Sequence, residues 1–152
     1  MKRLGLACLL WCGVSAQAAQ WIYFHSAMGN SSEYFNPAMT RQGQSTILRT
    51  FSRFSMPEMV PLDDPKGVFK FKLLPFASEQ SAYALDCQSK TVQLTRRTFY
   101  RDPDGKIQII TYQDNDPFIA KSNSEFAKQF LKTRVFPENV KAVKMMNLAC
   151  KV

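Results

Sequence analysis

The sequence predicts an α+β fold, in which an antiparallel sheet of about six strands precedes a C-terminal helix that packs on one face of the sheet. Short runs of β-branched and aromatic residues, separated by turn residues, extend as far as residue 113 and are typical of strands. Beyond Asp116 the apolar residues recur at helical spacing instead. Cys87 in the first part and Cys150 in the second are expected to clamp the helix to the sheet by a disulfide.

Residues 1–18 have the three regions of a secretory signal peptide. Two basic residues follow the initial methionine, an apolar stretch runs from Leu4 to Val14, and Ala16 and Ala18 occupy the positions that a signal peptidase reads. The apolar stretch is shorter than the roughly 20 residues that a membrane-spanning helix needs, so we expect no transmembrane segment. We expect cleavage after Ala18 and an exported protein that is periplasmic, secreted or displayed at the cell surface.

Lipid attachment to a cysteine of the signal is the alternative to simple cleavage. Trp11 stands before Cys12, where lipoprotein processing needs a small residue, and Cys8 comes too early, so simple cleavage is favoured. The mature chain, residues 19–152, is long enough for one domain with a modest core and too short for two. Loss of the two basic residues of the signal lowers the formal charge of +8 by two, to +6.

The mature chain keeps two cysteines, Cys87 and Cys150. An oxidising compartment normally pairs two such cysteines, and the bridge would close a long loop. Loop-closure entropy predicts that it adds about 4 kcal/mol to the free energy of unfolding. The alternative interpretation is two free buried thiols.

The first half of the mature chain contains three candidate strands. Residues 20–26 are aromatic and β-branched, and residues 33–36 form a second short piece that Pro37 is expected to stop. Residues 44–56 also favour extended structure, but their apolar residues fall on both faces. This mixture predicts an edge strand or a bulged strand.

A loop and four strands are expected next. Residues 57–67 contain three prolines and a glycine, so they are predicted to be irregular. Residues 68–74 alternate well enough for a short strand, which Pro75 is expected to end. Three central strands follow at residues 81–88, 91–101 and 106–113, the last two joined by the turn Asp102-Pro103-Asp104-Gly105.

Two helices are predicted near the C-terminus. Ser122 and Glu125 fit a capping box, which starts a short amphipathic helix that runs to about Thr133. Phe136-Pro137-Glu138 starts the second helix, because proline is tolerated at the first helical position and glutamate suits the positive end of a helix. One face of this helix is expected to pack against the sheet, and it comprises Val140, Val143, Met146 and Cys150.

The chain resembles the surface-adhesin protein E-like domain family of Gram-negative bacteria. The resemblance rests on the tryptophan-led first strand Trp21-Ile22-Tyr23, the Asp86-Cys87 pair in a central strand followed by a polar hairpin, and a terminal helix that closes on Cys150. It covers nearly the whole mature chain. It implies a curved antiparallel sheet, with the C-terminal helix held against the concave face by the disulfide.

The resemblance also implies a function. The characterised adhesin of the family binds host matrix and serum proteins such as vitronectin, laminin and plasminogen, and it can form a dimer, so a protein partner and a homodimer are expected here. That adhesin is anchored by lipid at the cell surface, whereas this signal has no convincing lipidation site. The present chain also has additional helical turns at residues 126–135.

No catalytic constellation is visible, so we expect a protein that is not an enzyme and that has neither a cofactor nor a metal site. His25 is the only histidine, and no metal ligand or nucleophile stands near it in the sequence. Candidate acidic ligands occur where aspartate forms turns or where the rest of a calcium loop is missing. They are Asp63 and Asp64, Asp102 and Asp104, and Asp114 and Asp116.

The basic residues of the central hairpin are the candidate ligand-binding residues. They are Lys90, Arg96, Arg97, Arg101 and Lys106. A surface of this sign attracts acidic partners, here an acidic host matrix or serum protein or an envelope ligand. Export argues against nucleic acid as a natural partner. Two other interpretations remain: the basic residues are only the solvated outer faces of strands, or the protein is a periplasmic accessory protein that contacts other envelope proteins through its sheet.

Overall fold

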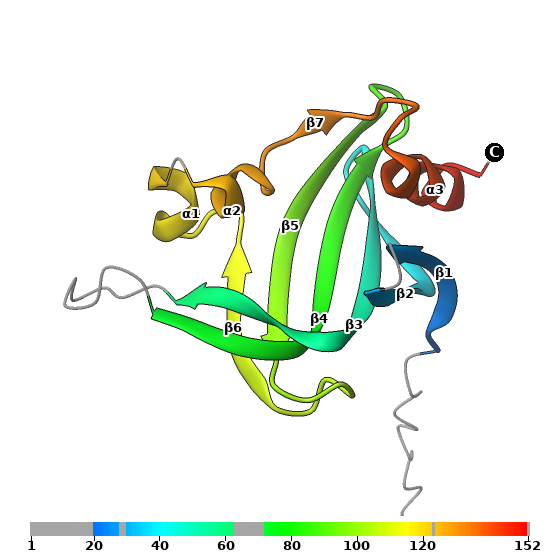
Figure 1. Cartoon of the computed structure of the whole chain (residues 1–152). Helices are drawn as coiled ribbons and strands as arrows, with labels where there is room; N and C mark the ends of the chain where they lie inside the picture. Colours follow the sequence, from blue (N-terminus) through cyan, green and yellow to red (C-terminus); the bar gives the residue numbers. More distant parts are fainter. Residues whose placement is uncertain (1–19, 28–29, 63–71, 123, 152) are drawn as a thin grey trace, which may run out of the picture.

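The computed structural model describes residues 20–27, 30–62, 72–122 and 124–151 (Figure 1). The predicted signal peptide and its cleavage site lie outside these residues. So do residues 63–67 of the predicted loop and the first part of the strand predicted at 68–74.

The fold is mostly β. Six strands form one antiparallel sheet in chain order, and a two-residue seventh strand pairs with β5. The strands are β1 (Ile22–Ala27), β2 (Ser31–Gln42), β3 (Ser45–Leu62), β4 (Lys72–Asp86), β5 (Thr91–Tyr100), β6 (Gln108–Gln113) and β7 (Thr133–Arg134). The helices are α1 (Pro117–Lys121), α2 (Glu125–Lys128) and α3 (Val140–Ala149).

The predicted α+β class therefore needs correction, because the helices are short. Of the two predicted helices, the first is only the four residues of α2. Its N-cap is Ser124, whose hydroxyl accepts from the amide of Ala127, rather than Ser122. The chain then leaves the helix and returns along β5 as β7, where Thr133 pairs with Val92. The helix α1, which Pro117 begins, was not predicted from the sequence.

The prolines expected to end strands lie inside them. β2 continues through Pro37, which has no backbone N–H to donate to a neighbouring strand. The register of β2 with β3 shifts between Asn36 and Thr40, so Pro37 lies where no such hydrogen bond is needed. β4 continues through Pro75, which is opposite Met59 of β3. At that point β4 has no neighbour on its other side, since its pairing with β5 begins only at Ser78.

The long strand β3 lies between β2 and β4, so residues 44–56 are not an edge strand. The predicted bulge is present, because the register of β3 against β4 shifts between Arg53 and Glu58. Beyond the shift, β3 continues to Leu62 and pairs only with β4. The sheet curves strongly, and its concave face carries α3 on one side and α1 and α2 on the other (Figure 1).

Two hydrophobic clusters fill the concave face. The first lies under α1 and α2 and comprises Val60, Phe76, Leu94, Phe99, Tyr112, Ile119, Ala127 and Phe130. The second attaches α3 to the sheet and comprises Leu48, Leu85, Val92, Ala142 and Met145. The C-terminal helix therefore packs on the face that the resemblance implies.

Buried polar residues also lie on this inner face. Glu33 and Glu79 are both opposite Ser52 of β3, and all three side chains are buried. Lys141 of α3 donates to Glu33 Oε1 at 2.9 Å, and Arg97 of β5 pairs with Glu79. Each buried carboxylate thus has a basic partner, as burial of a charge requires.

Candidate functional site

A disulfide joins Cys87 to Cys150, which confirms the predicted bridge. The Cα atoms lie 5.6 Å apart and the bridge spans a sequence separation of 63 residues. Cys87 follows β4 directly, and Cys150 caps the C-terminal end of α3. The bridge fixes the end of the helix against the end of the central strands. For a loop of this length the entropy it removes from the unfolded chain corresponds to about 4 kcal/mol.

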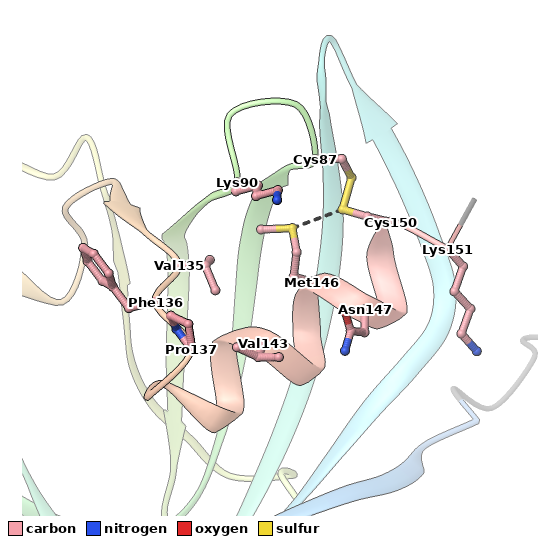
Figure 2. Close-up of a pocket in the computed structure, with 10 residues that line it drawn as sticks. All are labelled: Cys87, Lys90, Val135, Phe136, Pro137, Val143, Met146, Asn147, Cys150 and Lys151. Atoms are coloured by element: carbon pink, nitrogen blue, oxygen red, sulfur yellow. Dashed lines mark hydrogen bonds between the residues drawn. A yellow bond between two sulfur atoms is a disulfide. The ribbon is translucent and has the colours of Figure 1, made fainter.

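An open groove of about 600 Å³ lies beside this disulfide, between α3 and the chain segment that precedes it (Figure 2). Its lining is mainly apolar. It comprises Cys87, Lys90, Val135, Phe136, Pro137, Val143, Met146, Asn147, Cys150 and Lys151. Ligand sites in proteins typically have volumes of about 300 to 1,000 Å³ and apolar walls with a few polar groups. The groove meets both conditions, so we take it as the candidate site.

The helix face predicted to seek the sheet instead borders this groove. Val143, Met146 and Cys150 line the groove, and 55% of Val140 is exposed to solvent. The residues of α3 that are buried against the sheet are Ala142 and Met145. The prediction of the buried face was therefore only partly right: Met146 packs against the cluster that attaches α3 to the sheet, whereas Val140 is largely exposed. Both faces are apolar, and the small side chain of Ala142 lets the helix approach the sheet closely on the other one.

A backbone hydrogen bond attaches one side of the groove to the sheet. The amide of Val135 donates to the carbonyl oxygen of Lys90 at 2.9 Å, which attaches the segment before α3 to the β4–β5 turn. Lys90 has a φ of 52°, in the left-handed region. Asp86 stabilises the same turn by accepting from the amides of Gln88 and Ser89 at 3.0 and 3.1 Å. The Ser89 side chain, followed by these backbone hydrogen bonds, holds the pKa of Asp86 below its ordinary value.

Three sulfur atoms lie together at one end of the groove. Met146 Sδ is 3.1 Å from Cys150 Sγ, as the dashed line in Figure 2 shows. This is a sulfur–sulfur contact rather than a hydrogen bond, because a disulfide sulfur carries no proton. Met146 and Cys150 lie one helical turn apart, and their sulfur atoms make this end of the groove polarisable.

Two lysines give the groove its charge. Lys90 and Lys151 are both exposed, and neither has an acidic partner among the described residues. Phe136, which is 58% exposed, lies on the same groove. A groove lined by an exposed aromatic ring and by unpaired lysines is suited to a ligand with an apolar part and a negative charge.

The five basic residues predicted as one ligand site are distributed over separate places. Lys90 belongs to the groove. Arg96 and Arg97 are consecutive on β5 and therefore point to opposite faces of the sheet. Arg101 and Lys106 are exposed at the β5–β6 connection. There, Lys106 Nζ lies 3.8 Å from Asp104, which also pairs with Arg53 at 3.2 Å.

Arg97 belongs to the interior of the protein. Its Nε donates to Glu79 Oε2 at 2.8 Å and its Nη2 to the same oxygen at 2.5 Å, while its Nη1 donates to Gln129 Oε1. The guanidinium also lies 5.1 Å from the ring centre of Phe99. Burial acts to lower the pKa of Arg97, but the Glu79 carboxylate outweighs it and the pKa is raised. This residue has its partners already and is not available to a ligand.

The other residues considered from the sequence have local roles. Asp102 accepts from the amides of Asp104, Lys106 and Ile107 and so shapes the β5–β6 connection, as a turn former does. Asp116 accepts from the amide of Gln113. His25 is in β1, and its side chain lies outside the described part.

The described ranges contain neither a cluster of metal ligands nor a membrane-spanning helix. There, no three histidine, cysteine, aspartate or glutamate side chains group as metal ligands. No helix within those ranges is both long and apolar enough to cross a bilayer.

Comparisons with known proteins reveal a distant likeness in fold. No family model matches the chain, and no curated protein matches it significantly. Among solved structures, crystal form II of Haemophilus influenzae protein E is similar at 13% sequence identity and a TM-score of 0.49, over 78% of this chain and 80% of that one. A likeness at this level does not indicate what the present chain binds.

Proposed function

We propose that the protein is an exported, non-enzymatic binding protein, and that its groove takes an apolar segment of a partner protein with acidic residues at its edge. The observation that carries the proposal is the open apolar groove of about 600 Å³ with Lys90 and Lys151 beside it. The Cys87–Cys150 bridge and the hydrogen bond between Val135 and Lys90 give the groove a rigid frame. A preformed site loses less conformational entropy when it binds.

The openness of the groove favours a protein segment over a small molecule. A small apolar ligand binds tightly when most of its surface is enclosed, which an open groove does not provide. A protein partner can lay one or two apolar side chains against Phe136 and Val143 while the rest of its surface covers the rim. The two lysines then select a negative partner and speed its approach.

The site of action is the exterior of the cell or its envelope. The disulfide supports this, because such bridges persist in oxidising compartments. A host matrix or serum protein and another envelope protein are the two sources of partner that this location allows. Protease treatment of intact cells, with a periplasmic protein as control, separates them: loss of the protein indicates display at the surface, and protection indicates an envelope partner.

Fluorescence polarisation with short synthetic peptides tests the binding function. One labelled peptide set combines leucine and phenylalanine with aspartate and glutamate, and a matched set carries lysine in place of the acids. We expect the acidic set to bind and the basic set to bind at least about 10-fold more weakly. The variant Phe136→Ala should lose binding, whereas Arg101→Ala, at the β5–β6 connection, should retain it. Equal binding by Phe136→Ala, or by both peptide sets, would refute the proposal.

A further inference from the structure

The outer face of the sheet carries a pair of arginines that the groove does not involve. Arg49 of β3 and Arg96 of β5 are both in register with Ala82 of β4, one on each side of it. Neighbouring strands lie about 4.8 Å apart, so the two arginines start roughly 10 Å from each other across one small side chain. Their long side chains can meet over Ala82, where a larger residue would fill the space.

A hollow of about 120 Å³ occupies this position. Arg49, Gln80, Ser81, Ala82, Arg96 and Thr98 line it. No acidic residue lines it, and within the described residues neither arginine forms an ion pair. Two like charges that line one hollow without a counter-charge repel each other, so an anion between them would relieve a repulsion as well as gain two partners.

The neighbouring polar side chains are already oriented. Tyr100 Oη donates to Gln80 Oε1 at 3.2 Å, which leaves the amide nitrogen of Gln80, a residue that lines the hollow, as a donor. Thr98 Oγ1 is 2.9 Å from Thr111 Oγ1, so the side of the hollow formed by β5 is also fixed. Two arginines and one amide donor therefore line the hollow. The strands that carry them are held in place by the hydrophobic clusters on the other face of the sheet.

We infer that this hollow is a binding site for a single tetrahedral oxyanion, the phosphate or sulfate group of a monoester. Guanidinium groups bind such anions through paired N–H donors, and two forks with an additional amide donor suit a tetrahedral group with several acceptor oxygens. A volume of about 120 Å³ holds one such group and not the string of charges of a polyanion. The site lies on the sheet face opposite α3, so it is independent of the groove and of its proposed function.

Solution NMR of the full mature protein tests this inference. Inorganic sulfate and inorganic phosphate are titrated separately, with chloride at matched ionic strength as the reference, and the arginine Nε–H signals are followed. We expect saturable shifts for the signals of Arg49 and Arg96. Substitutions Arg49→Gln and Arg96→Gln should each weaken binding at least about 10-fold, since each removes a charge-assisted pair of hydrogen bonds. Arg41→Gln, which changes the net charge equally at an exposed place on β2, should bind as the parent does.

Two variants that keep the net charge distinguish a specific anion site from non-specific electrostatic attraction. Ala82→Val fills the hollow with a good strand former, and the double variant Arg49→Lys and Arg96→Lys keeps both charges without the forks. We expect each to weaken binding at least about 10-fold while the melting temperature stays within a few degrees. Shifts that do not saturate, or equal binding by the charge-preserving variants, would overturn the inference. Saturation with only one of the two anions would support it and identify the ester as sulfate or phosphate.

Discussion

Replacement of Arg97 by alanine should destabilise the protein severely, whereas the same change at its neighbour Arg96 should not. The side chain of Arg97 is 19% exposed and that of its partner Glu79 only 4% exposed. Removal of the guanidinium leaves the Glu79 carboxylate buried without its cation. Breaking a buried ion pair from one side costs about 3 to 5 kcal/mol of unfolding free energy. Arg96 is exposed and has no ion pair within the described residues, so its replacement should change stability by no more than about 0.5 kcal/mol.

Equilibrium urea unfolding at pH 7, with the disulfide intact, measures both changes. The double variant Glu79→Leu with Arg97→Met provides the control for the mechanism, because replacing both members of a buried pair by apolar residues is often neutral. It should recover most of the stability that Arg97→Ala loses. A loss below about 1 kcal/mol for Arg97→Ala would show that Glu79 reaches solvent, and the buried pair would then be the wrong description.

Three further changes follow from the structure. Burial acts to lower the pKa of Lys141, but Tyr83 and the Glu33 carboxylate outweigh it and raise the pKa above its ordinary 10.5. The contribution of Lys141 to stability is therefore full below pH 10.5 and is lost as the pH rises through the raised pKa. Lys141→Met should remove this alkaline loss in pH-dependent unfolding. Burial acts to raise the pKa of Asp102, but hydrogen bonds from backbone amides outweigh it and lower the pKa below 3.8. The contribution of Asp102 to stability is therefore present above pH 3.8 and is lost as the pH falls through the lowered pKa. Asp102→Asn should make hydrogen exchange of the Ile107 amide faster and independent of pH in that range, after correction for intrinsic exchange. Replacement of Cys87 and Cys150 by alanine should lower the free energy of unfolding by about 4 kcal/mol in urea, and an unchanged value would contradict the entropic account.

Much of the strand order and the bridge could be predicted from the sequence, because they depend on local signals. The turn at residues 102–105 is specified by aspartate, proline and glycine, and Gly105 has the positive φ of 71° that such a turn uses. The pairing of Cys87 with Cys150 could be predicted because only two cysteines follow the predicted signal peptide.

The strand ends were mispredicted because they depend on tertiary neighbours. Pro75 is compatible with β4 only because β5 does not reach it, which no local pattern reveals. The sequence likewise could not indicate which side of α3 packs on the sheet, because apolar residues occur both toward the sheet and toward the groove.

The candidate site was the least predictable part. Consecutive basic residues suggested one surface, yet the alternation of a strand places Arg96 outside and Arg97 inside. Arg49, which shares the outer hollow with Arg96, is 47 positions earlier and becomes its neighbour only through the register of β3, β4 and β5. Alternation could have separated Arg96 from Arg97, but no local signal identified Arg49.

Methyl NMR can show whether a ligand binds in the groove. An acidic, apolar peptide that binds in fluorescence polarisation is titrated into protein labelled at methionine and valine methyl groups. Binding in the groove predicts that the signals of Met146, Val143 and Val135, which line it, shift and saturate together, while the signals of Val60 in the other cluster stay unchanged. Shifts absent from the groove methyls, or confined to methyls elsewhere, would contradict it.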